Sequence, residues 1–158
     1  MNRIDCILED EDFKYHLKAT ESLEKERIFC HHDINHFMDV SRVAYIINLE
    51  KGYLIDKELI YATGLLHDIG RWVEYKEGKD HAIASAELAQ PILERCGFSK
   101  TEIEQVLSAI KAHRQKEQSS HLGAIIYEAD KTSRPCYNCN ARGQCKRFIN
   151  GEKFNLKY

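Results

Sequence analysis

The stretch LLHDIG at residues 65–70 places a histidine beside an aspartate at the end of an apolar run. The apolar spacing predicts that this run closes a helix, where a carboxylate meets the negative end of the helix dipole. A carboxylate in that position is unfavourable unless a cation compensates for it. A metal ion bound by His67 and Asp68 would be such a cation. The alternative is that Asp68 pairs with Arg71 or caps the turn.

The composition is typical of a globular protein. A chain of 158 residues suits a single domain, residues 1–158, with room for a sizeable core. Hydrophobic residues make up 43% and charged residues 30%, which argues against a disordered chain. The net charge of −2 shows no basic excess, so we expect no nucleic acid as a partner.

The start of the chain and its hydropathy bear on location. The sequence MNRIDCILEDEDF is acidic and lacks the apolar segment of a secretory signal. No run of about 18 apolar residues occurs, so we expect no membrane-spanning helix and no membrane partner. These features favour a cytoplasmic location.

The apolar spacing is helical through most of the chain, and two-residue alternation is absent, so we predict an all-α fold of five to six helices. Asp33, Asp56 and either Ser99 or Thr101 are suited to begin helices, and Gly52, Gly70 and Gly97 are suited to end them. Pro91 predicts a kink or a break. The expected helices cover approximately residues 10–27, 33–50, 56–70, 80–96, 99–117 and 120–132. Residues 133–158, rich in cysteine and basic residues, predict an irregular C-terminal tail.

Several of these helices carry a side chain that can bind a metal at one end or on the inner face. His36 lies on the first turn of the second helix, His81 opens the fourth, His113 lies near the end of the fifth, and Asp130 near the end of the sixth. Imidazoles and carboxylates are ligands that suit Zn, Mn and Fe, and helical bundles build metal sites from facing helices. For His16 and His121 we expect an ordinary core or surface position.

The order and the context of these residues resemble those of the HD-domain metal-dependent phosphohydrolase superfamily. The resemblance covers roughly residues 30–135 and includes HFMDVSRVAYII from residue 36, ATGLLHDIGRW from residue 62 and YEADKTSRP from residue 127. It implies a compact HD-domain helical bundle with four metal ligands, namely His36, His67, Asp68 and Asp130. It also implies cleavage of a phosphoester or phosphoanhydride bond, in a nucleotide or another phosphorylated small molecule, by a metal-activated water.

The second His-Asp doublet is then explained without a metal. Asp33 is expected to cap the second helix, and His31 or His32 to line the mouth of the pocket.

Superfamily members with two metals have two further histidines between the doublet and the last aspartate. His81 and His113 stand in that order here, which implies a dinuclear centre bridged by Asp68. The alternative is a mononuclear centre in which these two histidines bind only substrate phosphate. The sequence does not distinguish among Fe, Mn, Zn, Mg and Ni as the divalent ion.

Three basic residues near the proposed ligands could bind phosphate. Arg71, Arg114 and Lys131 each lie within a few residues of a ligand, and we predict catalytic roles for Arg71 and Lys131 beside Asp68. For each basic residue, a solvated surface position is the alternative. Trp72 could stack on a nucleobase, with core packing as the alternative.

Cysteines in the tail form a second candidate metal site. The spacing Cys136-x2-Cys139-x5-Cys145 is typical of Zn or iron–sulfur sites. Cys96, Cys30 or a histidine could supply the fourth ligand, and the alternative is reduced, metal-free thiols.

Two classes of function follow. The first is a metal-dependent phosphohydrolase with a small phosphorylated substrate, expected to be a nucleotide. The second is a non-catalytic metal- and ligand-binding regulatory module with a redox- or metal-sensing Cys tail. For both classes of function, the sequence leaves open whether the protein forms a homodimer.

Overall fold

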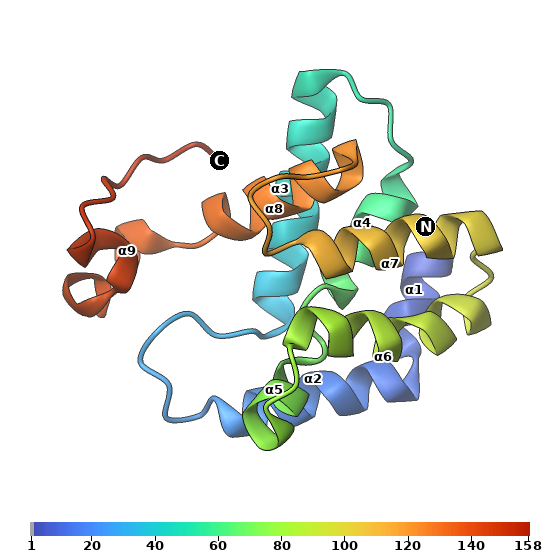
Figure 1. The fold of residues 1–158 in the computed structure, drawn as a ribbon, viewed down its shortest axis with the longest axis horizontal. Helices are drawn as coiled ribbons and strands as arrows, with labels where there is room; N and C mark the ends of the chain where they lie inside the picture. Colours follow the sequence, from blue (N-terminus) through green and yellow to red (C-terminus); the bar gives the residue numbers. More distant parts are fainter. Residues whose placement is uncertain (1) are drawn as a thin grey trace.

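The computed structural model describes residues 2–158, and the all-α prediction is confirmed for this part of the chain (Figure 1). Eight helices have seven residues or more, instead of the five to six expected, and three shorter helical turns follow them. The eight helices are α1 (Asn2–Glu9), α2 (Glu11–Leu23), α3 (Ile34–Lys51), α4 (Lys57–Leu66), α5 (Arg71–Glu77), α6 (His81–Arg95), α7 (Lys100–Ala112) and α8 (His121–Thr132). The tail contains η1 (Cys136–Asn138), η2 (Arg142–Gln144) and α9 (Lys146–Ile149). No helix of the described residues has the length and hydrophobicity needed to cross a membrane.

Helices α1 and α5 account for the difference in number. Helix α1 buries Ile4 and Ile7, too few apolar positions to form a visible stripe, and Asp10 then begins α2 as its N-cap. Helix α4 ends at Leu66 instead of Gly70, and a turn leads from it into the short α5. The His67-Asp68 doublet therefore lies in a turn between two helices.

Most predicted helix ends are confirmed because their signals are local. The Asp33 side chain accepts a hydrogen bond from the backbone N–H of His36 at 2.9 Å, and Asp56 caps α4 in the same way. Gly52 ends α3 with φ 64°, in the left-handed region that glycine favours. The predicted disturbance at Pro91 does not interrupt α6, which continues to Arg95. Pro91 lies on the exposed side of that helix.

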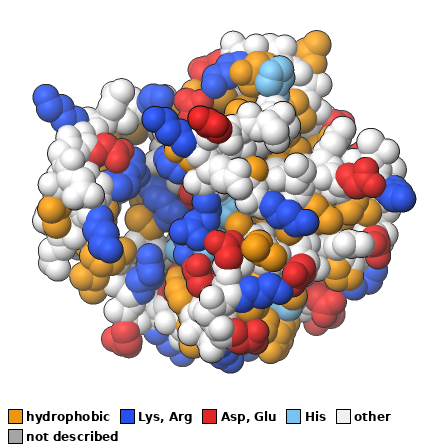
Figure 2. Space-filling model, in the orientation of Figure 1, with side chains coloured by type: hydrophobic (Ala, Val, Ile, Leu, Met, Phe, Trp, Pro, Cys, Tyr) orange, Lys and Arg blue, Asp and Glu red, His pale blue; other side chains and the backbone are white. Residues whose placement is uncertain are grey.

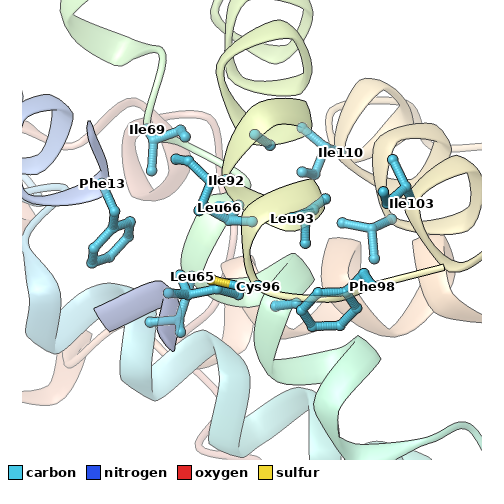
Figure 3. Packing of buried hydrophobic residues seen from close by; sticks show 14 of the residues in the cluster. Phe13, Leu65, Leu66, Ile69, Ile92, Leu93, Cys96, Phe98, Ile103 and Ile110 are labelled. Carbon is cyan, nitrogen blue, oxygen red and sulfur yellow. The ribbon is translucent and has the colours of Figure 1, made fainter. Parts of the chain in front are cut away.

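Helix α4 lies at the centre of the packing. Its Leu59, Leu65 and Leu66 belong to a core cluster shared with α1, α2, α6 and α7, whereas Ile60 belongs to a second cluster shared with α3 and α8. Figure 3 shows Leu65, Leu66 and Ile69 among side chains of α2 and α6, with Ile110 of α7 nearby. The turn that follows α4 is thus held by helices on all sides.

Two glycines allow the close approach of neighbouring helices to α4 and its turn. A Cβ at Gly64 would lie 2.9 Å from the Cα of Ser41 on α3. A Cβ at Gly70 would lie 2.8 Å from the backbone C and the Cβ of Ala84 on α6, and closer still to Ser85 N. The backbone N–H of Gly70 donates to Ser85 Oγ at 2.8 Å. This contact fixes α6 against the doublet turn.

Candidate metal centre

Four of the predicted ligands meet at the C-terminal end of α4. His36 comes from α3, His67 and Asp68 from the doublet turn, and Asp130 from α8. One ligand atom of each lies within 4.8 Å of the others, a group that could hold a metal ion. His36 Nε2 is 3.3 Å from Asp130 Oδ1, and His67 Nε2 is 3.4 Å from Asp68 Oδ2. We call these four residues the first ligand group.

Asp68 also belongs to a second group. His81, at the start of α6, places Nε2 3.1 Å from Asp68 Oδ1, and His113, directly after α7, places Nε2 3.4 Å from the same oxygen. These three ligand atoms again lie within 4.8 Å of one another. We call Asp68, His81 and His113 the second ligand group. The two oxygens of one carboxylate therefore face different groups of imidazoles.

The imidazole rings are oriented through their other nitrogen. His67 Nδ1 lies 2.8 Å from the carbonyl oxygen of Gly64, and His113 Nδ1 lies 2.6 Å from that of Ile110. His81 Nδ1 lies 2.9 Å from Glu74 Oε2. Because these partners only accept hydrogen bonds, each Nδ1 carries the proton and each Nε2 keeps its lone pair. This arrangement is found around metal-binding histidines.

Buried polar atoms without partners support the fit to a metal ion. The atoms His67 Nε2, His81 Nε2 and Asp68 Oδ1 are buried and have no hydrogen-bond partner among the described residues. Burial of an unpaired polar atom costs roughly 1–3 kcal/mol. Divalent cations, one in each ligand group, would satisfy all three atoms, and the donor set of imidazoles and carboxylates suits such ions.

The ionisation states of Asp68, Asp130 and His36 are those of metal ligands. Burial by itself would lower the pKa of His67, but the charges of Asp68 and Asp130 outweigh it and raise that pKa, so a metal ion there would replace a proton. Burial by itself would raise the pKa of Asp68, but the neighbouring His67, His113 and His81 outweigh it and hold that pKa well below its usual range. The pKa of Asp130 is likewise held low, because the neighbouring His36, His67 and Arg134 outweigh burial. Burial lowers the pKa of His36 to about 4. At neutral pH the carboxylates are therefore charged and His36 is neutral, as metal binding requires.

Of the three basic residues predicted near the metal ligands, the structure places only one beside Asp68. Arg71 Nε lies 3.5 Å from Asp68 Oδ2, as predicted for a residue beside the doublet. Lys131 is not brought to the ligand groups, because its Nζ lies over the Tyr127 ring, 3.6 Å from the centroid. Arg114 pairs with Asp80 at 3.0 Å on the exposed side.

Sequence reasoning missed Arg134 at the site. Its NH2 lies 2.8 Å from Asp130 Oδ1 and 3.4 Å from His36 Nε2. Its position four residues after Asp130 was the one available signal, since residues i and i+4 share a helix face.

A buried histidine beside Asp68 was also underestimated. His32 does not merely line a pocket mouth, because its Nε2 is 3.5 Å from Asp68 Oδ2 and its exposed fraction is 1%. Its Nδ1 is 2.6 Å from Glu24 Oε1, which also accepts a hydrogen bond from the Tyr75 hydroxyl at 2.5 Å. In the sequence Glu24 belongs to a highly charged stretch and gives no sign of burial.

The remaining aromatic and histidine positions are structural. Trp72 packs in parallel on His16, with ring centroids 5.8 Å apart, and its Nε1 donates to His16 Nδ1 at 3.2 Å. Trp72 therefore packs against the protein itself, which is the alternative to stacking on a nucleobase. His121 stacks on Tyr53 at the surface, 4.0 Å between centroids.

The cysteines divide into two sets. Cys96 forms a disulfide with Cys6, so it is wrong as a candidate fourth ligand of the tail site. Cys30, Cys136, Cys139 and Cys145 are free and half-buried.

Comparison with known proteins agrees with this geometry. The HD domain family model matches residues 33–134, a range that includes every member of both ligand groups. The chain belongs to the HD domain family. The HD domain assignment also explains the similarity to a solved structure, a protein described as a predicted HD superfamily hydrolase from an uncultured Thermotogales bacterium. That structure superposes with a TM-score of 0.64 and 28% sequence identity, over 93% of this chain and 78% of the other.

Relatives by sequence are of two kinds. An uncharacterized protein of Clostridium beijerinckii is 39% identical over the full length of both chains. Ribonuclease Y of Mycoplasma mycoides is 31% identical over 109 residues, and ribonuclease Y of Clostridium tetani is 33% identical over 96 residues. These alignments cover 67% and 61% of this chain but only 24% and 16% of the ribonucleases. The HD protein described here therefore matches only a part of those relatives.

Proposed function

We propose that this HD protein is a metal-dependent phosphohydrolase with two divalent ions, one in each ligand group. The observation that carries the proposal is the position of Asp68, whose two oxygens face two groups of imidazoles with free Nε2 atoms. Membership of the HD domain family and the similarity to a predicted HD superfamily hydrolase support the same reaction class.

A divalent ion held by these residues would supply Lewis acidity, which lowers the pKa of a water molecule and neutralises charge on a phosphate oxygen. The buried Asp68 carboxylate orients that water towards the phosphorus. Arg71 and Arg134 flank the two ligand groups, and their guanidinium groups can bind the non-bridging phosphate oxygens in bidentate fashion.

His32 is suited to accept a proton in this reaction. Burial lowers the pKa of His32, so its imidazole is neutral near pH 7. Because Nδ1 donates to Glu24, the lone pair is on Nε2, on the side that faces Asp68. We propose His32 as the general base that takes the proton of the attacking water.

The surroundings support an anionic substrate of small size. A pocket of about 300 Å³ lies beside the first ligand group and is lined by His36 and Arg134. Arg134 also lines a neighbouring pocket with Lys51, Lys131 and Arg147. Figure 2 shows Lys and Arg side chains gathered over this part of the surface, between the tail and the helices. A nucleotide or another phosphorylated small molecule fits this volume and charge, and the ribonuclease Y relatives add RNA phosphodiesters as candidates.

The test is hydrolysis by protein loaded in turn with Mn, Fe and Zn. The panel contains a chromogenic phosphodiester, nucleotides and a short RNA. We expect turnover of at least one phosphate ester, reduced at least about 100-fold in Asp68→Asn, with an unchanged helical circular dichroism signal. Asp5→Asn is the matched control, because Asp5 is exposed on α1, outside the ligand groups and outside both pockets beside them.

The opposite result has a defined meaning. If no loaded form cleaves any member of the panel while nucleotide binding stays tight, the proposal is wrong and the non-catalytic regulatory module is favoured.

A further inference from the structure

Four free thiols from distant parts of the sequence gather beside the first ligand group. Cys30 lies in the segment between α2 and α3, and Cys136, Cys139 and Cys145 lie in the tail, more than a hundred residues later. Cys30, Cys136 and Cys139 line the same pocket of about 300 Å³. Burial raises the pKa of the Cys136 thiol; Arg147 opposes this effect, and the charges of Cys30, Cys139 and Cys145 add to it. Cys136 therefore lies near the other three thiols.

The tail needs a source of stability other than a hydrophobic core. Among residues 133–158 only Ala141 is buried, and the helical turns there have three or four residues. Tyr137, Ile149 and Leu156 are exposed. Ordering the backbone costs roughly 1–2 kcal/mol per residue, which apolar burial in this segment cannot offset. Small segments of this kind are commonly stabilised by a bound metal or a disulfide.

The cysteine inventory leaves one consistent donor set. Cys6 and Cys96 are joined to each other on the other side of the central helix, in the first core cluster. The tail contains no histidine. Cys30 is a free thiol that lines the pocket with Cys136 and Cys139. His31 lines the same pocket, but its Nε2 lies 2.8 Å from the carbonyl oxygen of Arg27, so we take Cys30 as the fourth ligand.

We propose that Cys30, Cys136, Cys139 and Cys145 bind a thiolate-ligated metal centre, separate from the two His/Asp ligand groups. Arg134 lies beside Cys30 and Arg147 beside Cys136, so two guanidinium groups border the thiols. This site goes beyond the proposed phosphohydrolase activity and does not depend on it.

The spacing of the sulfur atoms bears on the kind of metal. A single Zn²⁺ with four Zn–S bonds of about 2.3 Å would bring its sulfurs to less than about 4 Å from one another. Among the described residues, no three of these sulfurs lie within 4.8 Å of one another. An iron–sulfur cluster attaches its thiolates to different iron atoms and so accepts wider spacing. The geometry favours a cluster over a single ion.

The centre would also link the tail to the first ligand group. Arg134 lies between the two sites, paired with Asp130 at 2.8 Å and close to the Cys30 thiol. A metal bound by Cys30 and Cys136 would fix two backbone segments next to the Arg134 side chain, namely the segment before α3 and the start of the tail.

The test counts metal in the full-length protein purified without oxygen. One sample is reconstituted with iron and sulfide and another with Zn²⁺. We measure iron, acid-labile sulfide, zinc and visible charge-transfer absorbance. The wild-type protein and Asp68→Asn are expected to bind a thiolate-ligated metal equally, since Asp68 belongs to the other site. Iron with sulfide identifies a cluster. One zinc per chain that is present in the wild-type protein but lost in Cys139→Ser identifies a single ion at the thiols, in addition to any zinc bound by the two His/Asp ligand groups.

Cys30→Ser and Cys139→Ser are the deciding variants, and Cys6→Ser is the matched control. We expect at least a tenfold loss of the thiolate-ligated metal in the first two and no loss in the control. Circular dichroism and a protease digest accompany the count, because a variant that is merely unfolded loses the helical signal, whereas loss of the centre exposes only the tail. Full metal content in folded Cys30→Ser, or no thiolate-ligated metal in either reconstitution of the wild-type protein, would overturn the proposal.

Discussion

Replacing Gly70 by alanine is expected to separate α6 from the turn that carries Asp68. Gly70 has φ −87° and ψ 5°, which alanine adopts without strain, so the effect comes from contact alone. The new Cβ would lie 2.8 Å from two atoms of Ala84, whereas ordinary contact begins at 3.4 Å. Helix α6 must therefore retreat by at least about 0.6 Å, the difference between these values, and by more to clear Ser85 N, which lies closer still. Overpacking costs about 1–3 kcal/mol, and weakening the hydrogen bond to Ser85 costs about 1 kcal/mol more.

The two ligand groups should respond differently to this substitution. His81 is the first residue of α6, so its Nε2 moves away from Asp68 Oδ1. The first ligand group comes from α3, α8 and the doublet turn and stays in place. We expect urea denaturation to give a free energy of unfolding lower by about 2–4 kcal/mol. Elemental analysis should show about one ion lost per chain.

The control for this prediction is Gly143→Ala in the tail. No atom lies within 4 Å of a Cβ at Gly143, so stability and metal content should stay unchanged. If Gly70→Ala keeps the wild-type urea midpoint and both ions, the contact between α6 and the doublet turn does not have the role assigned to it.

Three further predictions concern the second ion, acid stability and the disulfide. His81→Ala should reduce the bound Mn²⁺ from two ions to one by elemental analysis, and retention of two would contradict the second ligand group. Hydrogen bonds from His32 and Tyr75 outweigh burial and lower the pKa of Glu24 from 4.5 to about 2. The ionised Glu24 side chain therefore contributes about 3 kcal/mol to the free energy of unfolding. This contribution is present above pH 4.5 and lost as the pH falls towards 2. Glu24→Gln should therefore flatten the acid dependence of the unfolding free energy, and parallel curves would refute this. The disulfide closes a long loop between Cys6 and Cys96, so a reductant should lower that free energy by up to about 4–5 kcal/mol, with Cys6→Ser insensitive to the reductant.

Features with a local cause could be predicted from the sequence. Asp33 and Asp56 begin helices because a short carboxylate accepts hydrogen bonds from N–H groups only two or three residues ahead. The residues around His36, His67 and Asp130 resemble a known superfamily, and the structure brings these three side chains together.

Features that depend on the approach of distant segments could not be predicted. Glu24 is buried because the segment after α2 returns to His32, and Tyr75 approaches from α5. The short α5 directly follows Gly70, against which α6 packs, and it buries only Val73, too few apolar positions to show a stripe in the sequence. The pairing of Cys6 with Cys96 likewise requires the position of α1 against the end of α6.

The contact between Trp72 and His16 gives the molecule an optical reporter of its own. Trp72 is the only tryptophan in the chain, so emission excited at the red edge of the spectrum comes from this one indole. Its ring is stacked on an imidazole of α2 while its backbone follows Gly70 and Arg71 directly. A shift of the turn that bears Asp68 would alter this stacking and so the intensity of the emitted light. Stopped-flow fluorescence could then time the arrival of an ion without any added dye.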